Sequence, residues 1–132
     1  MESVPERLRK LLYNYDMTIV YVNSEIAYRE KKIDVLKNSR RNSAQKLMIE
    51  MKIEKDRYES YLEELIEQKK QLQENLDIVL NKYQPKYKAI FYYYFIQKKD
   101  LTEIAELTKF SYSNVKCIIR KLKNEIINAY EI

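Results

Sequence analysis

Glycine and histidine are both absent from the 132-residue chain, and this double absence excludes much of enzyme chemistry. Phosphate-cradling loops, dinucleotide fingerprints and nucleophile elbows depend on glycine, because glycine adopts positive φ without steric cost. Without histidine there is no imidazole base, no Cys/His dyad and no zinc site of the usual Cys/His kind. The sequence therefore predicts a protein that is not an enzyme and that binds no cofactor and no metal.

Cysteine and long apolar runs are also scarce. Cys117 is the one cysteine, so the chain has no second thiol with which to form an internal disulfide. No run approaches the roughly 20 apolar residues that a membrane span needs, and the N-terminus has no apolar signal region. We therefore expect a cytoplasmic protein with no membrane partner.

What the chain does contain is a large apolar fraction and an excess of bases. Hydrophobic residues make up 45% of it and charged residues 34%, which is typical of a folded chain rather than a disordered one. Lysine and arginine number 25 against 20 acids, and residues 86–132 carry nine bases and five acids. A basic C-terminal third is compatible with a nucleic-acid partner.

Two long stretches of the chain show apolar residues at steps of three and four. One stripe runs from Leu8 to Leu36 with a gap at Arg29, and the other runs from Met48 to Tyr83 with Lys55 and Lys69 at two of its core positions. Residues 38–43 between them contain no apolar side chain and predict a loop. The pattern is that of two helices of about 32 and 40 residues, each with a heptad stripe. We expect the two lysines to extend along the stripe towards solvent or to fix its register.

Helices of this length cannot bury such stripes alone, so they must pack against each other or against a second chain. The short polar loop favours a coiled-coil-like antiparallel hairpin. Further apolar residues outside the main stripe leave surface for a partner, and we expect the hairpin to form a homodimer as well; these residues are Ile49, Ile53, Tyr61, Ile66 and Ile78.

The pattern changes after Gln84-Pro85, because proline cannot continue a helix and the residue before it avoids the helical region. We therefore expect an all-α protein in which a helical hairpin occupies residues 1–84 and a second domain occupies residues 85–132. The second domain is expected to contain an apolar helix over residues 87–97, a short helix over 102–107, a turn over 108–110 and a last helix capped by Ser111. We expect the aromatic run Phe91–Phe95 to be packing core. The predicted inward residues of the last two helices are Ile104, Ala105, Leu107, Val115, Ile118, Ile119, Leu122 and Ile126.

Helix, three-residue turn, helix is the plan of a helix-turn-helix motif. The run from Glu103 to Lys116, EIAELTKFSYSNVK, resembles the E-I-A-E-x-L-G-I-S-x-x-T-V-K pattern of region 4 in the sigma-70 family, with departures at Thr108, Lys109 and Asn114. With the apolar helix upstream of it, the resemblance covers about 45 residues of the chain. The module behind a long helical region also resembles the small phage late-gene transcription regulators of the RinA and ArpU type. This resemblance implies a sequence-specific DNA-binding transcription regulator, located in the host cytoplasm if it is phage-encoded, with RNA polymerase as a further partner.

The last helix carries the candidate DNA contacts. From Ser111 to Asn124 the chain has four bases and no acid, which is typical of a surface that meets double-stranded DNA. Arginine bonds guanine bidentately, lysine and serine reach phosphate, asparagine pairs with adenine, and tyrosine contacts a thymine methyl or a phosphate. The expected DNA-binding residues are Tyr112, Ser113, Asn114, Lys116, Arg120 and Lys121.

Two other functions stay open from the sequence. A phage small-terminase-like DNA-packaging subunit also joins a helix-turn-helix to oligomerising helices. An interaction or inhibitor protein would act through the helical hairpin, with the C-terminal module as scaffold.

Overall fold

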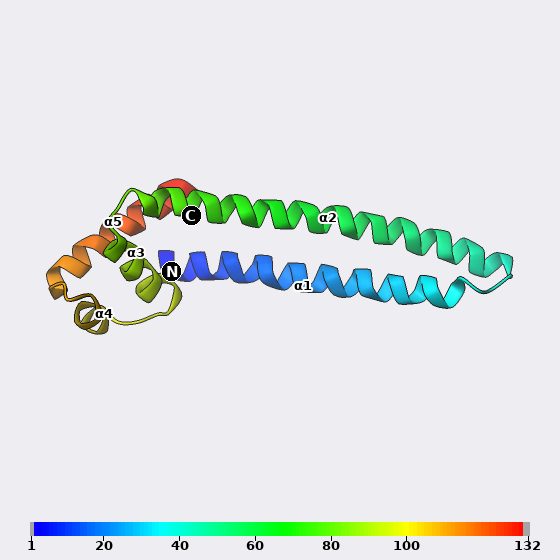
Figure 1. Cartoon of the computed structure of the whole chain (residues 1–132), viewed down its shortest axis with the longest axis horizontal. Coiled ribbons are helices and arrows are strands. Elements are labelled where there is room, and N and C mark those ends of the chain that lie inside the picture. Colours follow the sequence, from blue (N-terminus) through cyan, green and yellow to red (C-terminus); the bar gives the residue numbers. More distant parts are fainter. Residues whose placement is uncertain (1, 131–132) are drawn as a thin grey trace. The chain divides into compact units, whose positions relative to one another are not determined.

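The computed structural model describes residues 2–130, and the regular structure in that range is helical (Figure 1). The all-α prediction is therefore confirmed. None of the helices in this range has the length and apolar character that crossing a membrane requires. The elements are α1 (Val4–Leu36), α2 (Asn42–Asn81), α3 (Pro85–Phe91), the π-helical turn η1 (Tyr92–Ile96), α4 (Leu101–Thr108) and α5 (Tyr112–Tyr130).

The start of α1 is fixed by a reciprocal pair of hydrogen bonds. The backbone N–H of Glu6 donates to Ser3 Oγ at 3.3 Å, and the backbone N–H of Ser3 donates to Glu6 Oε2 at 3.4 Å. This is a capping box, which satisfies amides that have no partner within the helix. The helix ends at Leu36, and α2 begins at Asn42 after the polar segment that the sequence predicts as a loop.

The chain folds as two compact units. The first contains Met1–Tyr13 and Lys70–Ile132, of which residues 2–13 and 70–130 are described, and the second contains Asn14–Lys69. Helices α1 and α2 contribute residues to both units. The sequence places a boundary at 84/85, whereas the first unit also takes in the first residues of α1 and the last turns of α2.

Packing explains why the first unit combines segments of α1 and α2 with the C-terminal helices. Leu8 of α1 and Leu76 and Leu80 of α2 share one buried cluster with the C-terminal helices. Val4 and Leu12 lie at its edge and are partly buried. A heptad stripe shows which face of a helix is apolar, but it does not show which element covers that face. The C-terminal members of the cluster are Ile90, Phe91, Phe95, Ile104, Val115, Ile118, Ile119, Leu122 and Ile126.

The connection from α2 to η1 differs from the expectation in two details. Helix α2 ends at Asn81 rather than at Gln84, and Pro85 is the first residue of α3, a position where its missing N–H costs no hydrogen bond. The helix expected over residues 87–97 is divided into α3 and η1. In η1 the backbone N–H of Gln97 bonds the carbonyl oxygen of Tyr92 at 3.0 Å, and the chain then leaves through Lys98 at φ 59°.

In the second unit, α1 and α2 pack through their heptad stripes. Val22, Ile26 and Leu65 are buried there, and partly buried residues surround them, namely Tyr15, Ile19, Tyr58 and Leu62. The two lysines of the α2 stripe reach acids on α1. Lys55 Nζ lies 3.6 Å from Glu30 Oε1, and Lys69 pairs with Asp16. Their side chains are 29% and 28% exposed, as expected for lysines that extend from a stripe towards solvent.

Candidate nucleic-acid interface

Helix α4 precedes α5, the helix that carries the candidate DNA-binding residues, and it is fixed by a cap and a buried face. Asp100 caps the helix, because its Oδ1 accepts a hydrogen bond from the backbone N–H of Glu103 at 2.8 Å. Ile104 and Thr108 are buried, and the hydroxyl of Thr108 donates to the carbonyl oxygen of Ile104 at 2.7 Å. The buried threonine therefore has its hydrogen-bond partner within its own helix.

The prediction that Leu107 faces inward is wrong. Its side chain is 53% exposed, and Thr108 occupies the inward position instead. Residues four apart share one face of a helix, so Thr108 lies above Ile104 while Leu107 points to one side. In the region 4 pattern compared with residues 103–116, the leucine stands at the position that Thr108 occupies in this chain.

The turn between α4 and α5 depends on a left-handed lysine. Lys109 has φ 64° and ψ 17° and follows the last residue of α4. This is the position at which the sigma-70 region 4 pattern has glycine, which adopts left-handed φ without steric cost. Ser111 then caps the start of α5, since its Oγ accepts a hydrogen bond from the backbone N–H of Asn114 at 3.1 Å. The predicted cap at Ser111 is confirmed.

Helix α5 has one buried face and one exposed face. The five residues predicted to form its buried face are all buried, with Val115, Leu122 and Ile126 completely so. The six candidate DNA-binding residues are consequently exposed; they are Tyr112, Ser113, Asn114, Lys116, Arg120 and Lys121.

The exposed residues of α5 lie along three lines. Lys116 and Arg120, four residues apart, flank a hollow of about 220 Å³ that is also lined by Tyr94, Leu101, Ile119 and Lys123. Asn114 and Lys121 are seven residues apart, so they share a line on the other side of the exposed face. Four of the six candidates therefore lie in two pairs on different sides of the exposed face.

A middle line joins one of the six candidates to two residues that were not predicted as DNA contacts. Ser113 and the exposed Cys117 are four apart, and Asn124 continues the line one heptad after Cys117. The spacing of 113, 117 and 124 in the sequence was the signal that could have identified them.

The exposed face of α5 from Ser111 to Asn124 carries positive charges and no negative charge. Within residues 2–130, no acidic side chain forms an ion pair with Lys116, Arg120 or Lys121. Lys123 is turned aside, and its Nζ lies 5.3 Å from the ring centroid of Tyr94.

The nearest acid along α5 is directed to a different side of the helix. Glu125 accepts a hydrogen bond from the Tyr83 hydroxyl at 3.0 Å, and it lies 3.7 Å from Lys82 Nζ. Burial, and then the hydrogen bond to Glu125, raise the pKa of Tyr83. Helix α4 exposes Glu103 and Glu106, so the acid-free surface is confined to α5.

The aromatic run upstream contributes to the core. Phe91 and Phe95 are buried and their rings stack with centroids 4.9 Å apart. Arg9 of α1 donates a hydrogen bond from Nη1 to the carbonyl oxygen of Phe95 at 2.8 Å. These two rings are packing residues, as expected, and Tyr92 is the member of the run that is most exposed, at 56%.

No family model matches the chain, and comparisons with curated proteins and with solved structures found no match.

Proposed function

We propose that the protein is a sequence-specific, double-stranded DNA-binding transcription regulator. In this proposal α4, the turn at Lys109 and α5 form a helix-turn-helix related to region 4 of the sigma-70 family, and α5 is the recognition helix. The observation that carries the proposal is the two-faced character of α5. Its apolar face is buried against the core while its opposite face, from Ser111 to Asn124, exposes bases and no acid.

The positions on α5 support a division of roles. The N-terminal end of a recognition helix approaches base edges, and here that end exposes Tyr112, Ser113 and Asn114. Lys116 and Arg120 extend from one line of the helix, where an arginine can bond guanine bidentately and a lysine can reach phosphate. Lys121 on the other side of the exposed face reaches the opposite backbone. Because Glu103 and Glu106 are exposed on α4, the approach to DNA is through α5.

The long helices provide the second part of the proposal. We assign α1 and α2 to a coiled-coil-like helical hairpin that forms a homodimer. A dimer presents two recognition helices, so its operator has two half-sites separated by about one helical turn of DNA, roughly 34–36 Å, or by a multiple of it. The resemblance to phage late-gene regulators adds RNA polymerase as the expected protein partner near the promoter.

A second candidate function is favoured by the exposed apolar side chains of α1 and α2, among them Val35 at 75% and Val20 at 59%. Surfaces of this kind mark protein–protein contacts. The protein would then bind or inhibit another protein through the helical hairpin.

A small-terminase-like packaging subunit is the third candidate, and light scattering distinguishes it, because a packaging subunit forms a large ring whereas a regulator is a monomer or dimer.

The experiment that tests the proposal is selection of bound fragments from random double-stranded DNA with the full chain. A regulator enriches one motif, and its affinity for that motif falls linearly on a logarithmic scale as salt increases, because phosphate contacts release counterions. Absence of any enriched motif, together with no binding at low salt, would reject DNA binding and leave the protein-interaction candidate.

A further inference from the structure

The second unit buries little apolar surface for its size. Its buried apolar residues are Val22, Ile26 and Leu65, within a segment that runs from Asn14 to Lys69. Large apolar side chains stay exposed on both of its helices. Isolated helices are marginally stable in water, and their stability comes from packing of an apolar face. Burial against a partner surface would therefore stabilise this unit; its exposed large apolar residues are Met17, Val20, Tyr21, Tyr28, Val35, Ile49, Ile53, Tyr61 and Ile66.

One face of α2 in this unit carries two charges of opposite sign. Arg57 and Glu64 are seven residues apart, which is about two helical turns, so they lie on nearly the same side and about 10 Å apart along the helix. Both are exposed. Neither takes part in an ion pair within residues 2–130, although their neighbours Glu54, Lys55 and Glu59 do.

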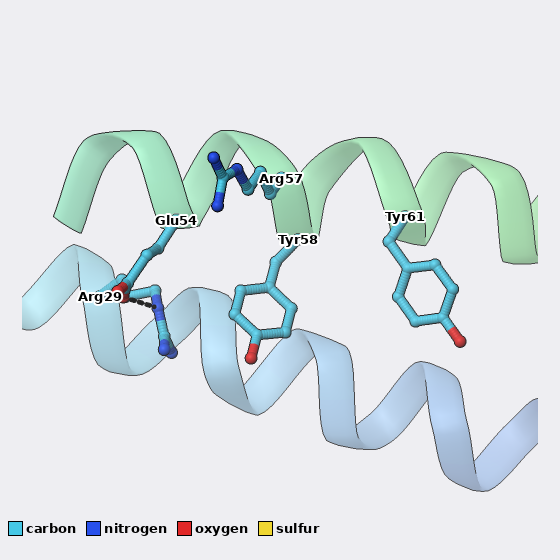
Figure 2. Close-up of a pocket in the computed structure, with 5 residues that line it drawn as sticks. All are labelled: Arg29, Glu54, Arg57, Tyr58 and Tyr61. Carbon is cyan, nitrogen blue, oxygen red and sulfur yellow. Dashed lines mark hydrogen bonds and ion pairs between the residues drawn. The ribbon is translucent and has the colours of Figure 1, made fainter. Parts of the chain in front are cut away.

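The surface between these charges is hollowed and aromatic. Arg57 and Glu64 line a hollow of about 390 Å³ together with Asp56, Ser60 and Tyr61. A neighbouring hollow of about 330 Å³ is lined by Arg29, Glu54, Arg57, Tyr58 and Tyr61. Figure 2 shows that the Arg57 side chain lies along α2, while Glu54 is the residue that reaches Arg29. Arg57 is therefore available to a partner.

We propose that a second copy of this chain docks on this face, with the two α2 helices antiparallel and a two-fold axis between Ser60 and Tyr61. In that arrangement Arg57 faces Glu64 of the partner subunit, and Glu64 faces Arg57 of the partner subunit. Tyr61 of each copy, which is 45% exposed in the single chain, lies next to the axis and becomes covered there. Tyrosine and arginine are the residue types that contribute most at the centres of protein interfaces.

The charge pattern selects this partner and this orientation. A two-fold interface presents the same patch from both chains, so it must be complementary to itself. Arg57 and Glu64 meet that requirement when the helices run antiparallel, because the axis lies midway between them. In a parallel pairing in register, each would face its own copy, and like charges in contact destabilise an interface. The pairing defines the dimer that the proposed function uses, but it does not depend on DNA binding.

A charge reversal with rescue tests the pairing directly. Sedimentation equilibrium of the full chain without DNA should show a dimer. Arg57→Glu alone and Glu64→Arg alone should each raise the dimer dissociation constant by about tenfold or more, because each reversal creates two like-charge contacts. The double variant Arg57→Glu, Glu64→Arg should restore the dissociation constant to within about threefold of the original value, since both pairs are re-formed with opposite polarity.

Lys70→Glu is the matched control. Lys70 is an exposed base on α2 whose Nζ lies 4.0 Å from Glu74 of the same chain. Its reversal should leave the dimer intact, and circular dichroism of each variant checks that the helices are retained. A monomeric unmodified chain, single reversals that do not weaken the dimer, or a double variant that stays monomeric would each overturn the pairing. A dimer that behaves as expected but selects no DNA would reject the proposed function and leave this inference standing.

Discussion

The guanidinium of Arg29 lies 4.6 Å from the ring centroid of Tyr58, within the packed stripes of α1 and α2. Arg29 occupies the gap in the apolar stripe of α1, and its side chain is only 13% exposed. It forms ion pairs with Glu25 of its own helix and with Glu54 of α2. The hydrogen bond to Glu25 is the largest of the effects that raise the pKa of Arg29. A charged residue therefore fills a core position by stacking on an aromatic ring and pairing its head group.

Replacement of this arginine should weaken the second unit. Arg29→Ala removes the stacking on Tyr58 and both ion pairs, and we expect the free energy of unfolding to fall by about 1–2 kcal/mol, since the two acids remain partly hydrated. Urea denaturation followed by circular dichroism measures the change. Arg41→Ala, at an exposed position before α2, is the control and should change stability by less than about 0.5 kcal/mol. Equal losses in the two variants would mean that Arg29 is not a core residue.

The left-handed turn predicts a stabilising substitution. Lys109 at φ 64° has the steric cost of a side chain in the left-handed region, so Lys109→Gly should raise the free energy of unfolding by about 0.5–1 kcal/mol. Lys109→Ala keeps a β-carbon and should give no such gain. Thermal unfolding of both variants provides the comparison. A glycine variant no more stable than the alanine variant would show that the turn carries no strain at this residue.

The two faces of α4 should differ sharply in their tolerance of substitution. Ile104 is fully buried, so Ile104→Ala should cost about 2–4 kcal/mol through lost burial and the cavity left behind. Leu107 is half exposed, and Leu107→Gln should change stability by no more than about 0.5 kcal/mol. Chemical denaturation of the two variants tests the orientation of the helix. A large loss at Leu107 would return it to the inward position that the sequence predicted.

The Tyr83–Glu125 contact should make stability sensitive to alkaline pH. The pKa of Tyr83 is raised above its ordinary value of 10.0, so the folded chain holds the proton more tightly than the unfolded chain does. The contribution to stability is therefore complete below pH 10.0 and is lost as pH rises from there through the raised pKa. Tyr83→Phe should show a smaller loss of stability across that range in denaturation curves recorded at successive pH values.

A second substitution separates the two causes of the shift. Glu125→Gln removes the carboxylate but keeps the phenol partly buried, so its loss of stability with rising pH should lie between those of the unmodified chain and Tyr83→Phe. If all three chains show the same alkaline loss, Tyr83 does not contribute to it.

The periodicity of apolar residues predicted most of the helices. It failed to identify the buried face where a helix is too short to repeat the pattern. Five residues of α5, from Val115 to Ile126, are buried as expected, because a long amphipathic helix repeats its pattern several times. Helix α4 has eight residues and little more than two turns, which left the choice between Leu107 and Thr108 to polarity. Polarity was misleading there, since Thr108 bonds its own helix and can be buried.

Other features depended on packing that the sequence does not contain. The stripe of α1 showed that Leu8 is apolar and inward, but not that the C-terminal helices cover it. Arg29 looked like a gap because the Tyr58 ring that stacks on it and Glu54, one of its two paired acids, lie on another helix, 25 and more residues away in the chain. The exposure of the candidate DNA-binding residues followed from the apolar periodicity of α5, which fixed its opposite face as the buried one.

The most direct measurement is the affinity of the chain for its selected DNA fragment, compared with that of Lys116→Gln, Arg120→Gln. The account predicts a loss of about 1–3 kcal/mol, which is roughly fivefold to 150-fold, with an unchanged melting temperature, because both side chains are exposed. The control Lys37→Gln, Lys52→Gln removes the same two charges from exposed positions outside α5 and should retain nearly full affinity. Equal affinity of the two double variants would contradict the assignment of α5 as the recognition helix.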